Sequence, residues 1–211
     1  MGIFLDSADV AEARQAMALG FVTGVTTNPA LMAKLEADPA DVIGRLCEVA
    51  QGPVFYQVTA DALAAREEEG RGIHALCPDK VVLKIPATTA NMVLVARLVP
   101  EVPCAVTAVY SGMQAYLGCE AGARYVIPYV NRATRLQGDG MGLVSEISQA
   151  IQAAENQPEI LAASIKSPDE ALAALNSGAH HLTMPLELIK RLGDHPLSDQ
   201  AIEEFRQAAR G

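Results

Sequence analysis

The chain has 211 residues, of which half are hydrophobic and 19% are charged, and its formal net charge is −9. This composition is too apolar for a disordered chain and offers no basic stripe to a phosphate backbone, so we expect neither disorder nor a nucleic-acid partner. No apolar stretch is as long as a membrane span and the first residues do not resemble a leader peptide, which predicts no membrane partner. The cysteines form no CxxC pair, as expected of reduced thiols in a cytoplasmic protein. They are Cys47, Cys77, Cys104 and Cys119.

Short apolar runs alternate with amphipathic segments of helical length along the whole chain. This alternation predicts strands that are joined by helices. Two helix starts are marked by an N-cap residue followed by Pro, at Asp38 and at Ser167, and Glu170 is the acid at the third position of the second helix. The expected strands lie near residues 3–5, 22–25, 54–57, 81–84, 103–107, 125–129, 159–163 and 180–183.

Eight strand-helix units without a linker predict a (β/α)₈ TIM barrel, formed as a single domain by residues 1–211. A doubly wound open sheet is the alternative. One further helix, over residues 198–210, has no strand of its own. Because its residues Ile202 and Phe205 need burial, we expect this helix to cap the barrel or to dock on a neighbouring subunit.

The expected strands end in polar residues, and barrel active sites lie at the carboxyl ends of the strands. A single Thr or Ser at such a position would be explained by a strand that meets water. Seven polar strand ends together favour a site for a hydroxyl-rich, phosphorylated carbonyl compound. The residues of this set are Asp6, Thr26, Asn28, Gln57, Lys84, Thr107, Tyr129, Arg132, Ser164 and Lys166.

Lys84 stands alone in an otherwise apolar run, KVVLKIP, over residues 80–86. Burial among Val, Leu and Ile would remove the hydration of its ammonium group and lower its pKa. A neutral buried amine is a nucleophile for carbonyl groups. The alternative is that Lys84 merely ends its strand and extends to solvent, and the polar strand ends around it favour the first interpretation.

Three other features are given structural interpretations. The pair His180 and His181 has no third ligand spacing, so we expect core or rim histidines and no metal site. The glycine-rich segment 138–142 is not a dinucleotide fingerprint and is predicted to be a flexible loop over the barrel mouth. The acidic run 67–69 is interpreted as a solvated helix face.

Three motifs carry a resemblance to a known family. They are TGVTTNP at residues 23–29, VLKIP at 82–86 and PYVNR at 128–132. With these motifs the chain resembles the small transaldolase family, and its fructose-6-phosphate aldolase branch in particular. The resemblance implies a (β/α)₈ barrel, a lysine Schiff base without metal or other cofactor, and cleavage or formation of the bond between a dihydroxyacetone unit and an aldehyde.

The resemblance also implies a role for each residue of the polar set. Lys84 would form the Schiff base, and Asp6 would assist proton transfer at the substrate hydroxyl next to the bond being broken. Asn28 and Ser164 would bind the dihydroxyacetone hydroxyls, with support from Thr26. The proton-shuttling water would be held by Gln57, Thr107 and Tyr129. Arg132 and Lys166 would bind the phosphate of the aldehyde half.

Two positions separate the branches of the family. Transaldolases of similar length typically carry Glu in place of Gln57 and Phe in place of Tyr129. The resemblance therefore favours an aldolase that reversibly cleaves fructose 6-phosphate to dihydroxyacetone and glyceraldehyde 3-phosphate. A transaldolase that transfers the dihydroxyacetone unit is the alternative, and a non-catalytic sugar-phosphate-binding barrel is a more remote one. By resemblance, the assembly would be a homo-oligomeric ring of five, or two such rings stacked as a decamer.

Overall fold

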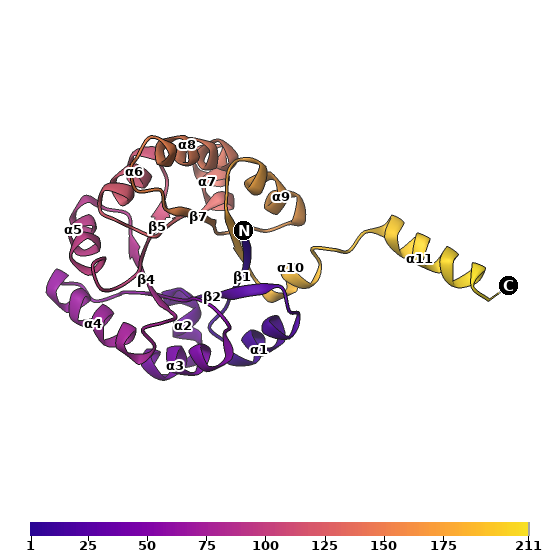
Figure 1. The fold of residues 1–211 in the computed structure, drawn as a ribbon, viewed down its shortest axis with the longest axis horizontal. Coiled ribbons are helices and arrows are strands. Elements are labelled where there is room, and N and C mark those ends of the chain that lie inside the picture. The colour runs from indigo at the N-terminus through magenta and orange to yellow at the C-terminus, as the bar shows by residue number, and fades with distance from the viewer. Residues whose placement is uncertain (211) are drawn as a thin grey trace.

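The computed structural model describes residues 1–210, and in this range eight parallel strands form a closed barrel surrounded by helices (Figure 1). The strands pair in chain order, and the first pairs with the eighth to close the ring. This closure confirms the predicted (β/α)₈ barrel and is incompatible with the open sheet. The strands are β1 (Gly2–Asp6), β2 (Val22–Thr26), β3 (Val54–Gln57), β4 (Val81–Pro86), β5 (Cys104–Val109), β6 (Tyr125–Pro128), β7 (Glu159–Ala162) and β8 (His181–Met184).

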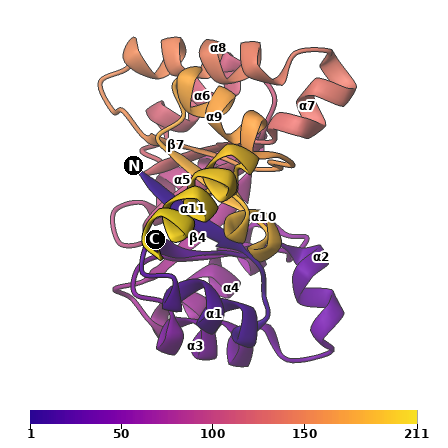
Figure 2. The same ribbon diagram turned by 90° about the vertical axis from the view of Figure 1, so that its right-hand side faces the viewer.

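Helices connect the strands and cover the outside of the barrel. Figure 2 shows α1, α3 and α4 on one side of the strands and α6, α8 and α9 on the opposite side. The helices that precede β5 are α1 (Val10–Ala18), α2 (Pro29–Met32), the 3₁₀ turn η1 (Ala33–Leu35), α3 (Pro39–Val49), α4 (Leu63–Leu76) and α5 (Thr89–Leu98). Those that follow β5 are α6 (Gly112–Glu120), α7 (Val130–Gln137), α8 (Gly140–Gln152), α9 (Pro168–Asn176), α10 (Leu186–Lys190) and α11 (Pro196–Ala208).

The helix starts follow the expected capping chemistry. The side chains of Asp38 and Ser167 accept hydrogen bonds from backbone N–H groups of the first turns of α3 and α9, each of which has Pro at its beginning. The prediction of a loop over residues 138–142 is wrong in part. Residues 140–142 form the first turn of α8, because Asp139 caps that helix by accepting from the N–H of Gly142 at 2.7 Å.

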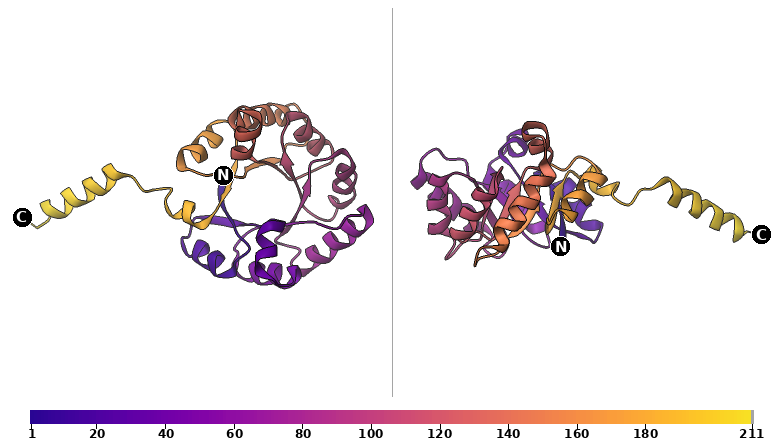
Figure 3. Two further views of the ribbon diagram at one scale, coloured as in Figure 1. Left: turned by 180° about the vertical axis from the view of Figure 1, so that it is seen from behind. Right: turned by 90° about the horizontal axis from the view of Figure 1, so that it is seen from above.

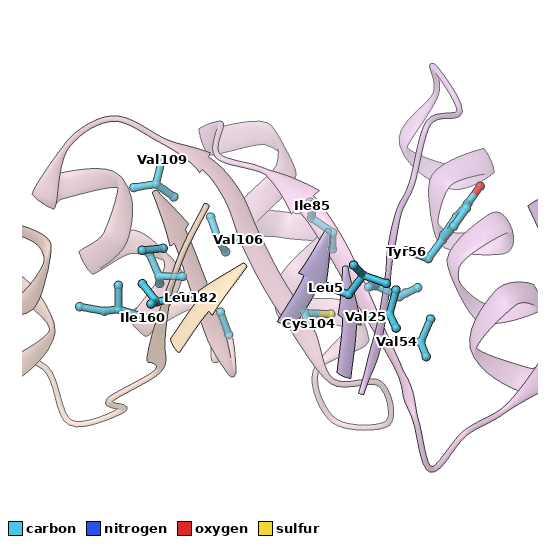
Figure 4. Packing of buried hydrophobic residues seen from close by; sticks show 14 of the residues in the cluster. Leu5, Val25, Val54, Tyr56, Ile85, Cys104, Val106, Val109, Ile160 and Leu182 are labelled. Atoms are coloured by element: carbon cyan, nitrogen blue, oxygen red, sulfur yellow. The ribbon is translucent and has the colours of Figure 1, made fainter. Parts of the chain in front are cut away.

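Hydrophobic side chains fill two separate regions. The larger one lies between the strands and the surrounding helices and includes Leu5, Val25 and Ile160 (Figure 4). The smaller one fills the inside of the barrel, where Phe55 makes edge contacts with Phe4 and Tyr125, at ring-centroid distances of 5.7 and 5.1 Å. This interior cluster closes the barrel below the carboxyl ends of the strands, so only those ends are left to form a mouth.

The C-terminal helix α11 extends away from the barrel (Figures 1 and 3). None of its residues is buried, and Leu197, Ile202 and Phe205 are exposed. The expectation of an additional C-terminal helix is confirmed, but the helix does not cap its own barrel. Over residues 1–210, no helix combines the length and the apolar character that crossing a bilayer requires.

Candidate active site

The interior cluster and the polar mouth are successive layers of the same strands. Side chains two residues apart on a strand point to the same face. Phe4, Phe55 and Val82 belong to the interior cluster, so Asp6, Gln57 and Lys84, each two residues later, also face the inside of the barrel, one layer closer to the mouth. The alternation within β1, β3 and β4 therefore places an apolar floor beneath a polar layer.

The polar layer surrounds a cavity of about 380 Å³. Nine of the ten residues predicted for the site line it, and they come from six of the strand ends. These nine are Asp6, Thr26, Asn28, Gln57, Lys84, Tyr129, Arg132, Ser164 and Lys166. The tenth, Thr107, is fully buried behind this surface and contacts Tyr129. The predicted convergence of the strand ends is thus found in the structure.

Lys84 lies at the centre of this arrangement with only 4% of its surface exposed. Its Nζ atom donates a hydrogen bond to the backbone carbonyl of Thr27 at 2.7 Å. Burial lowers the pKa of Lys84 from 10.5 to about 8, although the negative charge of Asp6 opposes the shift. With this pKa, about one amine in five is neutral at pH 7.4 and available as a nucleophile. The alternative, in which the Lys84 side chain extends to solvent, does not hold.

Asp6 is held by a chain of two hydroxyl groups. The Oγ1 atom of Thr26 donates to Oδ1 of Asp6 at 3.1 Å and lies 2.6 Å from Oγ1 of Thr183. Since the single hydroxyl hydrogen of Thr26 is directed to the carboxylate, Thr183 is the donor of the shorter bond. Thr183 also lines the cavity. It was missed in the sequence, although it ends the eighth expected strand and the same strand-end rule would have selected it.

Tyr129 and Gln57 occupy the cavity wall on two sides of Lys84. Thr107 donates a hydrogen bond to the Tyr129 hydroxyl at 3.3 Å. Burial raises the pKa of Tyr129, and the bond from Thr107 partly offsets this rise, so the phenol remains protonated at neutral pH. The Oε1 atom of Gln57 is buried and has no hydrogen-bond partner among residues 1–210. A hydroxyl donor on a ligand would relieve the free-energy cost of this buried acceptor.

The motif at residues 23–29 places Asn28 at the mouth. Gly24 is required for close packing, because a Cβ atom there would collide with the carbonyl oxygen of Pro53 and the ring of Phe4. Asn28 then has the extended backbone expected before Pro29 and caps α2, accepting from the N–H of Leu31 at 3.0 Å. With its oxygen engaged in this way, Asn28 presents the amide hydrogens of its side chain to a ligand.

Three predicted binding residues follow β6 and β7: Arg132 lies in the first turn of α7, and the other two lie on the loop before α9. Arg132 is exposed at the rim, with its guanidinium carbon 5.0 Å from the centre of the Tyr129 ring. Ser164 has a left-handed backbone, with φ of 63°, which turns the chain sharply after β7. Lys166 follows on the same loop and is exposed. Two cations at the rim of an otherwise acidic chain can bind an anion such as a phosphate group.

The acidic run on α4 differs from its predicted role. Glu69 does not belong to a solvated face, since its carboxylate accepts from the Tyr56 hydroxyl at 2.7 Å and from the backbone N–H groups of Thr59 and Ala60 at about 3 Å. These bonds lower the pKa of Glu69 against the opposing effect of its burial. Glu69 therefore fixes the loop that follows Gln57.

The two neighbouring histidines lie in different environments. His181 is buried inside the barrel against Phe4 and Tyr125, whereas His180 is exposed. Within the described part of the chain, no group of three or more His, Cys, Asp and Glu side chains is arranged to hold a metal ion. The chemistry that the cavity residues themselves can perform is imine formation at Lys84, with a carboxylate and a phenol at hand for proton transfer.

Residues 3–210 match the family model described as "Transaldolase/Fructose-6-phosphate aldolase". The chain belongs to this family. It is 39% identical over 206 residues to a "Probable transaldolase" of Herpetosiphon aurantiacus, covering 97% of this chain and 93% of the relative. A "Probable transaldolase" of an Anaeromyxobacter species is 38% identical, covering 97% of this chain and 95% of the relative. The chain is thus an enzyme of the transaldolase and aldolase type.

Solved structures of low sequence identity share the fold. The crystal structure of mandelate oxidase with benzoyl-formic acid superposes with a TM-score of 0.63 at 14% identity, covering 84% of this chain and 59% of that one. At this identity the likeness concerns the barrel alone. The names of the sequence relatives correspond more directly to the transaldolase alternative than to the aldolase branch.

Proposed function

We propose that this family member is a class I aldolase that reversibly cleaves fructose 6-phosphate to dihydroxyacetone and glyceraldehyde 3-phosphate. The observation that carries the proposal is the buried Lys84 amine, whose pKa is lowered to about 8, beneath a polar cavity. A sugar-phosphate-binding protein without catalysis would have no use for a desolvated amine, whereas imine chemistry depends on one.

The proposed reaction begins with addition of the Lys84 amine to the ketone carbonyl, which gives a carbinolamine. Loss of water from this adduct leaves a protonated imine. Asp6 then accepts the proton of the C4 hydroxyl as the C3–C4 bond breaks, and the bonding electrons move into the imine to give an enamine. The aldehyde leaves, the enamine is protonated at C3, and hydrolysis of the new imine releases dihydroxyacetone and restores the amine.

The side chains around Lys84 suit these steps. Tyr129, oriented by Thr107, would deliver and accept protons through a water molecule that Gln57 also holds. The amide hydrogens of Asn28 and the hydroxyl of Ser164 would bind the hydroxyl groups of the dihydroxyacetone unit. Arg132 and Lys166 at the rim would bind the phosphate of the aldehyde half, where a guanidinium can engage two oxygens at once.

Tyr129 and Gln57 are the reason for preferring cleavage to transfer. A lyase must protonate and hydrolyse its dihydroxyacetone imine, and a phenol beside an uncharged amide supports both steps. Transfer of the dihydroxyacetone unit between sugar phosphates is the second candidate, and the name "Probable transaldolase" of the relatives favours it. The two functions differ in whether the imine waits for an acceptor aldehyde.

The decisive assay measures fructose 6-phosphate consumption with and without erythrose 4-phosphate. Release of dihydroxyacetone without the acceptor would support the lyase, and strict dependence on the acceptor would establish the transferase instead. Borohydride added with dihydroxyacetone should attach a stable mass to the peptide that contains Lys84. The binding-only alternative predicts no such label, and full activity of Lys84→Ala would refute the mechanism.

A double variant tests the two branch positions directly. Tyr129→Phe removes the phenol but keeps the ring, so cleavage should fall by ~10²-fold, as expected for lost general acid-base assistance. Combining it with Gln57→Glu recreates the pattern typical of transaldolases, and transfer relative to cleavage should rise. An unchanged ratio in the double variant would contradict the role assigned to these residues.

A further inference from the structure

The first turn of α7 and the loop before α9 carry the two predicted phosphate-binding cations, and a single carboxylate outside the cavity contacts both segments. One oxygen of Glu170, on α9, accepts from the side-chain amide of Asn131 at 3.0 Å. Its other oxygen accepts from the backbone N–H of Lys166 at 2.6 Å. Asn131 immediately precedes Arg132 in the chain. Glu170 is therefore one bond away from each of the two segments that hold the cations.

The position of Glu170 in its helix shows that this arrangement is not ordinary capping. In a capping box, the acid at the third helical position turns back to the N–H of the N-cap residue. Here Ser167 performs its half of the motif by accepting from the N–H of Glu170 at 3.1 Å. The Glu170 carboxylate does not bind the N–H of Ser167. It binds the N–H of Lys166, the residue before the N-cap, and the side chain of Asn131 on α7. The acid of the capping motif identified in the sequence thus has a second use, which is to join α7 to the loop before α9.

The backbones of α7 and of the loop before α9 are already joined nearer to the barrel. The N–H of Val130 donates to the carbonyl of Ala163 at 2.9 Å, and the N–H of Asn131 donates to that of Ser164 at 3.3 Å. Beyond these bonds the chain continues along α7 and through the loop before α9, and α7 and α9 lie on the same side of the barrel (Figure 1). Glu170 is the side chain that continues the connection outward to Lys166.

We infer that Glu170 is a positioning residue that sets the separation of Arg132 and Lys166 and thereby determines the preference of the enzyme for phosphorylated aldehydes. The inference rests on the proposed function, in which these two cations bind the aldehyde phosphate. Neither Glu170 nor Asn131 lines the cavity, so both act on the substrate only through the helix turn and the loop that they join. Donors held at a fixed separation bind an anion more tightly than donors whose separation varies, because less conformational entropy is lost on binding.

The direction in which phosphate binding changes when the Glu170 carboxylate is removed distinguishes a positioning role from a purely electrostatic one. A carboxylate close to a phosphate site repels the phosphate, so electrostatics alone predicts that removing Glu170 improves phosphate binding. Positioning predicts the opposite. The test compares KM and kcat for glyceraldehyde 3-phosphate and for unphosphorylated glyceraldehyde in the synthesis direction, with dihydroxyacetone as the donor and the full-length enzyme.

Glu170→Gln keeps the size of the side chain, but it replaces one acceptor oxygen with a donor, so it can satisfy only one of the two partners. We expect it to raise KM for the phosphorylated aldehyde by roughly 10-fold, the loss of a charge-assisted hydrogen bond, with KM for glyceraldehyde and both kcat values nearly unchanged. Asn131→Ala should have the same selective effect. In the double variant the two effects should not add, since both remove the same connection.

Ser167→Ala is the matched control. It removes the cap of the same helix and leaves both contacts of the Glu170 carboxylate in place, so it should lower the melting temperature without changing the preference for phosphate. Equal losses for both aldehydes in Glu170→Gln, or a lower KM for the phosphorylated one, would overturn the inference. If Arg132→Ala also fails to discriminate between the aldehydes, the proposed phosphate site itself is wrong. If Arg132→Ala impairs only the phosphorylated aldehyde while Glu170→Gln impairs both aldehydes equally, the phosphate site stands and only the positioning role of Glu170 is refuted.

Discussion

The Nζ atom of Lys84 donates a hydrogen bond to the carbonyl oxygen of Thr27 at 2.7 Å, which ties the proposed nucleophile of β4 to the end of β2. The bond accounts for one of the three hydrogens of an ammonium group, and the low pKa reflects the poor solvation of the rest of the charge. Formation of an imine would require this contact to change as the nitrogen turns toward the substrate carbonyl.

The pH dependence of imine formation should follow the pKa of Lys84. Only the neutral amine attacks a carbonyl group, so the rate of borohydride-trapped labelling should rise with pH and level off above about 8. Asp6 raises the pKa of Lys84 through its charge, and Asp6→Asn should therefore shift the midpoint of the labelling profile to lower pH. A midpoint that stays near the ordinary lysine value of 10.5 would contradict the burial of the amine.

Thr107 should act on catalysis only through Tyr129. Thr107→Val has nearly the same shape but cannot donate to the phenol, so cleavage should fall by about 5-fold, the equivalent of one hydrogen bond of about 1 kcal/mol. Thr107→Ser should retain most of the activity. In the background of Tyr129→Phe, the Thr107→Val substitution should have little further effect on kcat, and a full additional loss would show that Thr107 has another role.

Thr183 should be required for the function of Asp6. Thr183→Val removes the donor to Thr26, whose hydroxyl is then free to rotate away from the carboxylate, and we expect a several-fold lower kcat, again the scale of one hydrogen bond. Thr183→Ser, which keeps the hydroxyl, is the control. Steady-state assays at matched folded fraction distinguish this effect from instability, and wild-type activity in the Val variant would exclude the chain of hydroxyl groups from the mechanism.

His181 should make the barrel sensitive to mild acid. Burial lowers its pKa from the ordinary value of 6.5, against the opposing effects of Glu159, whose carboxylate lies 3.3 Å from Nε2. His181 therefore binds a proton more readily in the unfolded chain than in the folded one. Its contribution to the free energy of unfolding is complete above about pH 6.5 and is lost as the pH falls below this value. The N-terminus and His180 also face this ring and disfavour its protonation.

Chemical denaturation between pH 5 and 8 measures this dependence. His181→Asn should be less stable at pH 8 but should lose less stability on acidification than the parent. Equal loss of stability on acidification in His181→Asn and in the parent would exclude His181 as the source of this pH dependence.

The projecting helix α11 should mediate self-association. Phe205 is 71% exposed and Ile202 is also uncovered, and such apolar residues on a helix away from its own barrel favour a contact with a second copy. Ile202→Glu with Phe205→Glu should lower the mass found by sedimentation. Met113→Glu on α6, at a residue that is 65% exposed, is the control. A parent protein that sediments as a monomer would disprove the expected homo-oligomer.

The strands were predictable because each is short, apolar and bounded by turn residues, and all eight are found within about two residues of their expected ends. The same property made the placement of the candidate site residues at the mouth predictable. Once the fold is a barrel, a polar residue at the end of an apolar run has only the mouth to face, as Asp6, Gln57 and Lys84 illustrate.

Other parts of the site depend on contacts that no local pattern encodes. Glu69 lies in a run of three acids, and its bonds to Thr59 and Tyr56 form only when the loop after β3 folds back over α4. Glu170 was identified as a helix start, but the direction of its carboxylate depends on α7, nearly 40 residues earlier. The position of α11 away from the barrel was not predictable either. An amphipathic pattern shows that one face of a helix needs burial, but it does not show which surface buries it.

The bond between Thr26 and Thr183 joins residues 157 positions apart, and it crosses the seam at which β1 pairs with β8. Asp6, Thr26 and Thr183 therefore come together only when the first and last strands have met. A half-barrel fragment that contains β1 to β4 would have Lys84, Asp6 and Thr26 but would lack Thr183. Separated halves should therefore regain activity only when they reassemble. Recovery of turnover during refolding would thus report closure of the ring between β1 and β8, the two strands that lie farthest apart in the sequence.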